Sequence, residues 1–450
     1  MTKQQIEQLL ENSSHQSVKF AVTDIDGVLR GKLISKEKFL NALDKGVGFC
    51  NVIFGWDMND EVYDNSEVSG WHTGYPDSFA LIDPSTIRNI PWEEGKLFFL
   101  ADFSESNDLS GVCPRSVLKK VEQQLSELGY TSKFSAEFEW FNFLETPHSL
   151  QEKDYTNPTP LTPGMFGYSI LRASQNSEYV NDLFESLSNF GVPIEGLHTE
   201  TGDGVYEAAI AYTSVVEAAD RATLFKTAVK EIASQYGLTA SFMSKWTDRL
   251  PGCSAHIHQS LWDAEGNNLF YDDKREKNLT ELAQQYIAGV LHCLPYIMPM
   301  YAPTINSYKR YVEGSWAPTS ASWGVENRTT TLRVIPHGKK SMRIENRVPG
   351  ADINPYLAMA GSLASGLYGI NNNLELNIPA TSGNQYELTE QKRLPQDLKT
   401  AIEAMKDSEI PVELFGKEFV DHFIKTREWE CHQYDPNKSN WELKRYFEII

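Results

Sequence analysis

Two histidines alternate in a short segment near the middle of the chain. His256 and His258 lie two residues apart within residues 250–263, after a Pro-Gly turn. In a strand, residues two apart share a face, so both imidazoles and the Ser260 hydroxyl should point the same way. Such a face suits a divalent cation or a polyphosphate. A pair of ordinary surface histidines explains this segment equally well when it is taken alone.

Pairs of glutamates occur in two earlier segments. Glu137 and Glu139 flank a phenylalanine, so both carboxylates should share one strand face, which is unfavourable unless a cation lies between them. Glu200 and Glu207 bracket a Gly-rich turn that could bring them toward one point. The simpler alternatives are a solvent-exposed strand face for the first pair and an ordinary hairpin for the second.

A later segment alternates basic and acidic residues. Arg343, Glu345 and Arg347 should share one strand face, with charges in the order plus, minus, plus. The face could be a self-neutralising surface strand, or a metal carboxylate flanked by arginines that bind phosphate or carboxylate groups. Further basic residues lie close by in the sequence, namely Arg328, Arg333, Lys339 and Lys340. In an acidic chain this basic density indicates an anion pocket.

Together these segments offer five glutamates and one histidine as ligands for a hard cation. Oxygen-rich ligand sets favour Mg²⁺ or Mn²⁺ over zinc, which usually brings cysteine or more histidine. Divalent cations beside arginines are the equipment of phosphoryl transfer. The chain contains no GxxxxGK[ST] loop, so a nucleotide would have to bind by another architecture.

Length and composition narrow the classes of protein and partner. A chain of 450 residues favours two domains. A net charge of −20 argues against nucleic acid as the main partner. The absence of a long apolar run or a signal-peptide core predicts a cytoplasmic protein that does not span a membrane. The five scattered cysteines are most simply reduced thiols.

The elements that must position these side chains alternate without a regular βαβ rhythm, which favours an α+β fold with an antiparallel sheet. A small mixed domain should end near residues 104–114. Residues 49–54 are predicted to be a strand. A capping box opened by Ser214 should start a helix that runs to residue 236. Another helix is predicted over residues 279–294, stopped by Pro295.

Five blocks of the sequence, taken together, resemble the glutamine synthetase superfamily over nearly the whole chain. The blocks are residues 137–139, 198–207, 252–260, 306–310 and 327–347. The resemblance implies a small β-grasp domain over residues 1–110 and a large catalytic domain over residues 111–450, with an antiparallel sheet and surrounding helices. It also implies a homo-oligomer of hexameric rings, as a hexamer or a dodecamer, with active sites shared between subunits.

The resemblance also implies roles for individual positions. One metal ion would be held by Glu139, Glu200 and Glu207, and a second, nearer the ATP phosphates, by Glu137, His256 and Glu345. The positions that match nucleotide contacts are Glu195, His258, Ser260, Lys340 and Arg343. The positions that match glutamate contacts are Gly252, Arg310 and Arg347, and those that match contacts to the transferring phosphoryl group are Arg328 and Arg333. ATP would phosphorylate the γ-carboxylate of glutamate, and a nitrogen nucleophile would then displace phosphate to leave an amide.

One departure from the family pattern bears on the nucleophile. Ammonia-using members carry a glutamate six residues after the arginine of the 306–310 block, and here that position is Trp316. An indole cannot take a proton, but it can pack against an organic amine. Relatives that make γ-glutamyl amides of polyamines and other amines have a similar Ser-Trp-Ala-Pro-Thr segment. Asp57 is a candidate for the amine-site carboxylate that a neighbouring subunit would supply.

Three hypotheses follow for the activity. The leading one is an ATP- and Mg²⁺-dependent γ-glutamyl ligase that acts on an organic amine. The second is a glutamine synthetase that uses ammonia, with another group in place of the missing glutamate. The third is a structural relative without catalysis, which the complete set of metal-ligand positions and arginines disfavours, because buried charges without ligands are costly.

Overall fold

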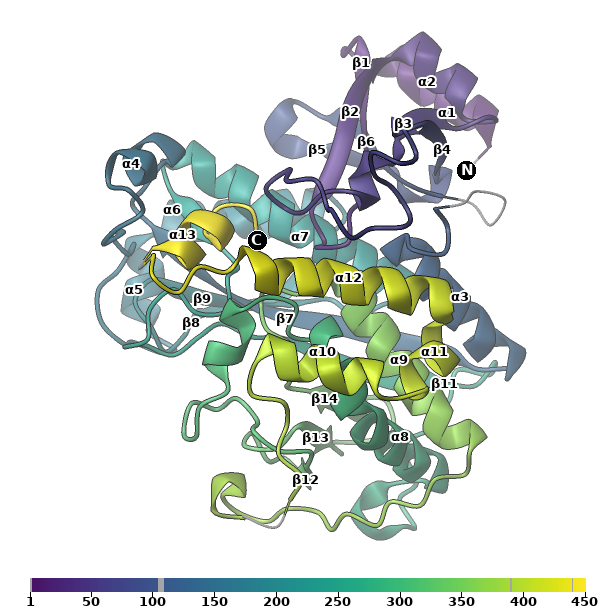
Figure 1. The fold of residues 1–450 in the computed structure, drawn as a ribbon, viewed down its shortest axis with the longest axis vertical. Coiled ribbons are helices and arrows are strands. Elements are labelled where there is room, and N and C mark those ends of the chain that lie inside the picture. The colour runs from purple at the N-terminus through teal and green to yellow at the C-terminus, as the bar shows by residue number, and fades with distance from the viewer. Residues whose placement is uncertain (1, 104–108, 389–390, 439) are drawn as a thin grey trace.

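The computed structural model describes residues 2–103, 109–388, 391–438 and 440–450, which form two β-sheets and surrounding helices (Figure 1). The smaller sheet is N-terminal and has the order β2-β1-β6-β4-β3, with β5 paired to β6. Its strands are β1 (Ser17–Thr23), β2 (Leu29–Ser35), β3 (Val47–Cys50), β4 (Asp77–Ile82), β5 (Arg88–Ile90) and β6 (Lys96–Phe103). Helices α1 (Lys3–Asn12) and α2 (Lys36–Ala42) accompany this sheet.

Strand β6 is apolar over most of its length because both of its faces are covered. Phe99 belongs to the core of the N-terminal sheet. Phe98 and Leu100, one residue away on either side, point the other way and belong to the larger core. Alternate side chains of β6 therefore pack into the core of the small sheet and into the larger core, which connects the two.

The larger sheet has the order β12-β13-β14-β11-β7-β9-β8, with β10 paired to β7. Its strands are β7 (Thr131–Phe143), β8 (Ile194–Thr199), β9 (Val205–Ile210), β10 (Thr239–Ser241), β11 (Ala255–Trp262), β12 (Trp323–Val325), β13 (Leu332–Ile335) and β14 (Arg343–Asn346). All neighbouring strands in it are antiparallel except β12 and β13. The expected α+β fold with an antiparallel sheet is confirmed.

The remaining helices are α3 (Pro114–Glu127), α4 (Pro147–Glu152), α5 (Ile170–Gln175), α6 (Ser177–Asn189), α7 (Val215–Gln235), α8 (Glu281–Ile297), α9 (Pro355–Asn371), α10 (Leu398–Lys406), α11 (Ile410–Phe415), α12 (Lys417–Gln433) and α13 (Trp441–Tyr446). Helix α7 packs against β7 and β10 of the large sheet, and α9 packs against α3, α7 and α8. Figure 1 shows α12, in yellow, running across the molecule below the N-terminal sheet. Within the described ranges, no helix is long and apolar enough to cross a membrane.

Three local predictions differ from the structure. The strand expected over residues 49–54 ends at Cys50 and continues as the 3₁₀ helix Asn51–Phe54, which buries Ile53 and Phe54. Ser214 precedes α7 without a side-chain capping bond. Pro295 does not stop α8 but lies inside its last turn, where it removes one backbone donor while Leu294 and Ile297 remain fully buried.

The division between domains stays a prediction. Part of the expected boundary, residues 104–108, lies outside the described residues. Leu109 and Cys113 still pack into the N-terminal core, whereas Val117 on α3 belongs to the larger one.

Candidate functional site

The register of three strands aligns one row of acidic and imidazole side chains. Glu139 on β7 lies directly opposite Glu207 on β9, and Glu207 lies opposite His198 on β8. Residues directly opposite each other in antiparallel strands point to the same face of the sheet. These three side chains therefore project from one face, together with Glu200 just beyond the end of β8.

A second row runs through the strands on the other side of β7. Glu137 lies opposite His256 on β11, and His258 lies opposite Glu345 on β14. Arg333 on β13 continues this row, because it lies opposite Glu345. The alternation in the sequence and the strand register together bring five carboxylates to one place.

Both rows open into one cavity of about 590 Å³. Eighteen residues were singled out in the sequence for metal, glutamate, amine, phosphoryl or nucleotide contacts, and fourteen of them line this cavity. They are Glu137, Glu139, Glu200, Glu207, His256, His258, Gly252, Arg310, Trp316, Arg328, Arg333, Arg343, Glu345 and Arg347. Glu195, Ser260 and Lys340 line a neighbouring cavity instead, and Asp57 lines neither.

Distances within the acidic cluster suit divalent cations. Three groups each bring their ligand atoms within 4.8 Å of one another: Glu137 with Glu207 and His256, Glu137 with His258 and Glu345, and His198 with Glu200 and Glu207. The His256 Nδ1 atom lies 3.5 Å from Glu345 Oε1 and 3.8 Å from Glu137 Oε2. Oxygen donors with a single imidazole are a donor set that Mg²⁺ and Mn²⁺ accept.

Like charges in the cluster repel one another. Burial and then the neighbouring charges of Glu139 and Glu137 raise the pKa of Glu207 to about 10. A carboxyl with such a pKa stays protonated at neutral pH unless a cation compensates it. The donor set therefore fits a bound divalent cation better than an ion-free cluster.

Glu345 differs from Glu207 because basic groups surround it. Arg333 Nη1 lies 3.0 Å from its Oε2 atom and Arg347 Nη1 lies 2.5 Å from its Oε1 atom. Burial opposes ionisation of Glu345, but the charges of Arg347 and His256 outweigh it and lower the pKa to about 2. Glu345 is therefore ionised throughout the neutral range.

A hydroxyl and a backbone amide fix the position of Glu139. The Ser254 backbone N–H donates to Glu139 Oε2 at 2.8 Å, and the Ser254 hydroxyl donates to Oε1 at 2.6 Å. Both oxygens keep further lone pairs for a cation.

Arg310 lines the cavity with a buried and partly unsatisfied guanidinium. Its Nη2 atom donates to the Val348 carbonyl, whereas its Nε atom is buried without a partner in the described structure. A buried donor without a partner is costly, which favours an anionic ligand here. Gly252 packs against this side chain, and a Cβ atom at that position would lie 2.3 Å from the Ser244 carbonyl oxygen.

The neighbouring cavity has a volume of about 310 Å³ and shares a wall with the acidic one. Glu137, His258 and Arg343 line both cavities. Arg343 Nε donates to His258 Nδ1 at 3.1 Å, which leaves His258 Nε2 facing Glu137 Oε2 at 3.1 Å. The three predicted nucleotide contacts that are absent from the acidic cavity, Glu195, Ser260 and Lys340, all line this second cavity.

Trp316 lies at the mouth of the acidic cavity, and its side chain is 60% exposed. Its φ of 64° places this bulky residue in the left-handed region, which costs energy unless neighbours hold the loop. The Tyr386 hydroxyl donates to the adjacent Ala317 carbonyl at 2.9 Å and helps to hold it. Arg347 Nη2 reaches the Trp316 carbonyl at 3.5 Å.

Asp57 lies away from the cavity in its own subunit. It is buried, and its Oδ2 atom accepts from Arg445 at 2.8 Å and from Trp429 Nε1 at 3.0 Å. Burial opposes ionisation of Asp57, but the Arg445 charge prevails and lowers its pKa. A contact of Asp57 with the cavity of a neighbouring subunit stays a prediction.

Sequence reasoning gave no role to several residues that line the cavity, among them Tyr168, His198 and Ser254. His198 alternates with Glu200, so the period of two could have found it. Tyr168 stacks on His198 with ring centroids 4.4 Å apart. It lies in an irregular loop, where periodicity carries no information.

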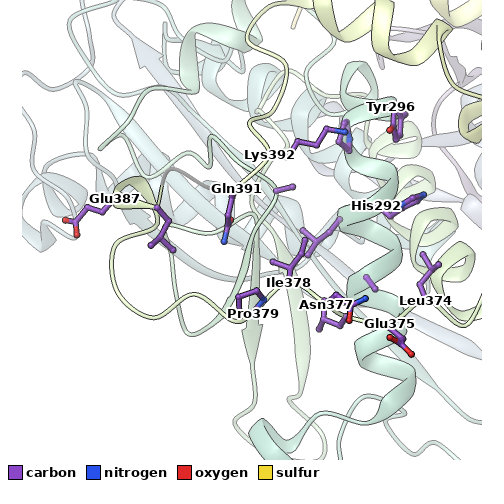
Figure 2. A pocket seen from close by; sticks show the side chains of 16 residues that line it. His292, Tyr296, Leu374, Glu375, Asn377, Ile378, Pro379, Glu387, Gln391 and Lys392 are labelled. Carbon is purple, nitrogen blue, oxygen red and sulfur yellow. The ribbon is translucent and has the colours of Figure 1, made fainter.

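A larger cavity of about 890 Å³ lies elsewhere, between α8 and residues 374–379, 387–388 and 391–392 (Figure 2). Figure 2 shows Tyr296 and Lys392 at one end and Glu375 at the other. Its lining is mainly apolar and contains no cluster of metal ligands among the described residues. This cavity does not have the donors that phosphoryl transfer needs.

Comparisons with known proteins agree on one family. The family described as "Glutamine synthetase, catalytic domain" matches residues 111–446. "Type-1 glutamine synthetase 2" of Dictyostelium discoideum is 51% identical over 438 residues, which cover 96% of this chain and 84% of that protein. The glutamate–isopropylamine ligase of a Pseudomonas species is 36% identical over 99% of this chain and 98% of that protein.

Two further relatives extend the comparison. The gamma-glutamylethanolamide synthetase of Streptomyces coelicolor is 35% identical over 96% of this chain and 92% of that protein. The solved structure of a complex of GmaS with ADP superposes with a TM-score of 0.84 and 26% identity, covering 97% of this chain and 98% of that one.

Proposed function

The chain belongs to the glutamine synthetase family, whose members are ATP-dependent glutamate ligases, and we propose that it joins the γ-carboxylate of glutamate to an organic amine. The observation that carries this proposal is the acidic cavity itself. Five carboxylates, three imidazoles and several arginines converge there beside a second cavity that suits a nucleotide.

The cluster would hold two divalent cations, Mg²⁺ or Mn²⁺. One would be bound by Glu139, Glu200 and Glu207, and the other by Glu137, His256 and Glu345. When bound, these ions would neutralise charge on the phosphate oxygens. The strand registers place these side chains before any ligand arrives, so little reorganisation is needed.

Arginines would bind both anionic substrates. We assign Gly252, Arg310 and Arg347 to the glutamate carboxylates, since Arg310 keeps a buried donor without a partner. Arg328 and Arg333 would stabilise the transferring phosphoryl group. Glu195, His258, Ser260, Lys340 and Arg343 would contact ATP. The γ-carboxylate oxygen attacks the terminal phosphorus and ADP leaves; the amine then attacks the acyl carbon and phosphate leaves.

Trp316 favours an organic amine as the nucleophile. Its indole carries no charge to attract ammonium, and it lies with Tyr168 at the cavity where the nucleophile must enter. Ammonia is the second candidate, because the relative with 51% identity is named a glutamine synthetase.

Phosphate release tests the proposal. We expect ATP, Mg²⁺ and glutamate to give phosphate when methylamine, ethylamine or ethanolamine is added, at a rate at least tenfold above that with ammonia. The product should be the γ-glutamyl amide by mass spectrometry. A preference for ammonia over every organic amine would leave a glutamine synthetase and refute the amine assignment.

We also propose that the enzyme works as a cytoplasmic homo-oligomer of one hexameric ring or of two stacked rings. Apolar side chains beside the cavity are strongly exposed, among them Ile170 at 81% and Leu171 at 67%. Exposed apolar groups of this kind favour association with a partner surface. Native mass spectrometry should show six or twelve subunits.

A further inference from the structure

A separate cavity of about 580 Å³ adjoins the catalytic one, and Trp316 and Arg328 line both. We call it the tail cavity. We propose that it receives the tail of the amine substrate and selects an uncharged or anionic tail over one with a second ammonium group. The inference rests on the proposed function, which supplies an amine whose reacting nitrogen lies on the catalytic side of Trp316.

Trp316 forms part of the wall of both the catalytic cavity and the tail cavity. The residue has a left-handed backbone and is 60% exposed. An amine whose nitrogen reaches the catalytic cavity past this ring has an open space of 580 Å³ on the other side for its remaining atoms. Ammonia or methylamine would leave that space unused.

The walls of the tail cavity are held in place by hydrogen bonds. One wall is residues 325–329 and the other is residues 380–383. The Asn327 side-chain amide joins them, because it donates to the Thr381 carbonyl at 3.3 Å and the Gly383 carbonyl at 2.8 Å. The Gln385 backbone N–H donates to the Thr329 hydroxyl at 3.0 Å. A preformed cavity loses less ordering entropy when a ligand enters it.

The side chains around the cavity set the kind of tail. Val325 and Ala380 offer apolar surface, while Thr329 and Ser382 add hydroxyls. A chain of methylene groups with a hydroxyl or ether oxygen, or a small ring, matches this mixture.

Charges at the rim disfavour a cationic tail. Lys277 and Arg328 are the basic residues of the lining, and Arg328 has no side-chain partner in the part of the chain that the structure describes. Glu326 is the acidic residue of the lining, but Arg333 Nε donates to it at 3.1 Å and His337 Nε2 lies 2.7 Å from its other oxygen. Lys277 is paired with Glu276. A second ammonium would therefore meet the Arg328 cation without a compensating carboxylate and a Glu326 carboxylate that is already paired.

The test compares amines that differ only in the tail. kcat/KM would be measured for methylamine, n-butylamine, 4-hydroxybutylamine and putrescine. We expect n-butylamine and 4-hydroxybutylamine to exceed both methylamine and putrescine at least tenfold. Putrescine has the same carbon chain as n-butylamine, so the comparison isolates the second charge.

Two variants, with one matched control, test whether the tail occupies this cavity. Ser382→Trp fills it from an exposed position, and we expect the ratio of kcat/KM for n-butylamine over methylamine to fall at least tenfold. Glu375→Trp is the matched control, since Glu375 is also exposed on the same segment but lines the large apolar cavity (Figure 2). This control should leave the ratio within twofold. Lys277→Glu should raise the use of putrescine relative to n-butylamine at least fivefold.

The outcomes separate the two proposals. If amines are substrates but Ser382→Trp leaves the ratio unchanged, the tail lies elsewhere and the inference is wrong while the proposed function stands. If putrescine is preferred in the wild type, the charge selection is wrong. If ammonia alone is used, both proposals fall.

Discussion

Glu207 combines two destabilising conditions in a single side chain. It is largely removed from water and feels the charges of four other glutamates, Glu139, Glu137, Glu200 and Glu345. A bound cation relieves both conditions. The protonation of Glu207 therefore depends on whether a cation is bound, even in the absence of substrates.

Without divalent cations, the protein should lose stability as the pH rises, and Glu207→Gln should weaken this loss. The folded-state pKa of Glu207 is raised from 4.5 to about 10, so its stabilising contribution is complete below pH 4.5 and falls between these two values. The slope is at most about 1.4 kcal/mol per pH unit for one proton. Calorimetric unfolding temperatures in chelator from pH 5 to 9 would measure it. Parallel curves for wild type and variant would contradict the assignment, and Mg²⁺ should flatten the wild-type curve.

Trp316→Glu should shift the enzyme toward ammonia. A carboxylate at this position can attract ammonium and accept a proton, which an indole cannot do. We expect kcat/KM for ammonia relative to ethylamine to rise at least tenfold. Val312→Glu is the matched control, because it adds the same charge at an exposed position nearby that does not line the cavity. An equal change in both variants would mean that general loop charge, and not contact with the nucleophile, sets the preference.

At the scale of elements, strand register explains why much of the candidate site could be predicted from the sequence. Alternation on β7, β9, β11 and β14 placed Glu137, Glu139, Glu207, His256 and Glu345 on strand faces, and pairing then brought those faces together. Loops follow no such rule, so sequence reasoning assigned no role to Tyr168, and the role of Asp57, which pairs with Arg445 in its own subunit, stays a prediction. Propensity also failed at Pro295, where burial of the surrounding helix outweighs one lost hydrogen bond.

Ser254 shows how a strand end serves the site, and Ser254→Ala should weaken divalent-cation binding about 10- to 100-fold. The change removes the 2.6 Å hydrogen bond that orients Glu139 Oε1 but keeps the backbone bond to Oε2. Ser132→Ala is a suitable control, because the Ser132 hydroxyl is also buried but has no partner within the described ranges. Isothermal titration with Mn²⁺ would compare them. Equal affinities in both variants would refute the orienting role.

At the scale of the whole molecule, ion pairs join the N-terminal sheet to the C-terminal helices. Arg427 on α12 donates to Asp26 Oδ1 at 2.5 Å and to the Pro303 carbonyl at 2.9 Å. Arg445 on α13 bonds Asp57. These contacts link residues about four hundred positions apart in the chain, so the first and last elements fold as neighbours.

Arg427→Ala should therefore destabilise the fold by about 3–5 kcal/mol, because it leaves Asp26 buried and unpaired. Adding Asp26→Ala should recover part of this loss. Glu428→Ala on the same helix breaks only an exposed pair with Lys406 and should cost less than about 1 kcal/mol. Urea unfolding would measure all four proteins. A loss in Arg427→Ala no larger than in Glu428→Ala would mean that the buried pair contributes little.

The wall formed by Glu137, His258 and Arg343 has a consequence for the fate of individual atoms. Because the acidic cavity and its neighbour meet at these residues, the glutamate γ-carboxylate and the terminal phosphate of ATP would meet there as well. Each turnover would then carry one carboxylate oxygen across the wall into the released phosphate. Glutamate labelled with ¹⁸O in its γ-carboxylate should yield phosphate that contains one heavy oxygen, whichever amine completes the reaction.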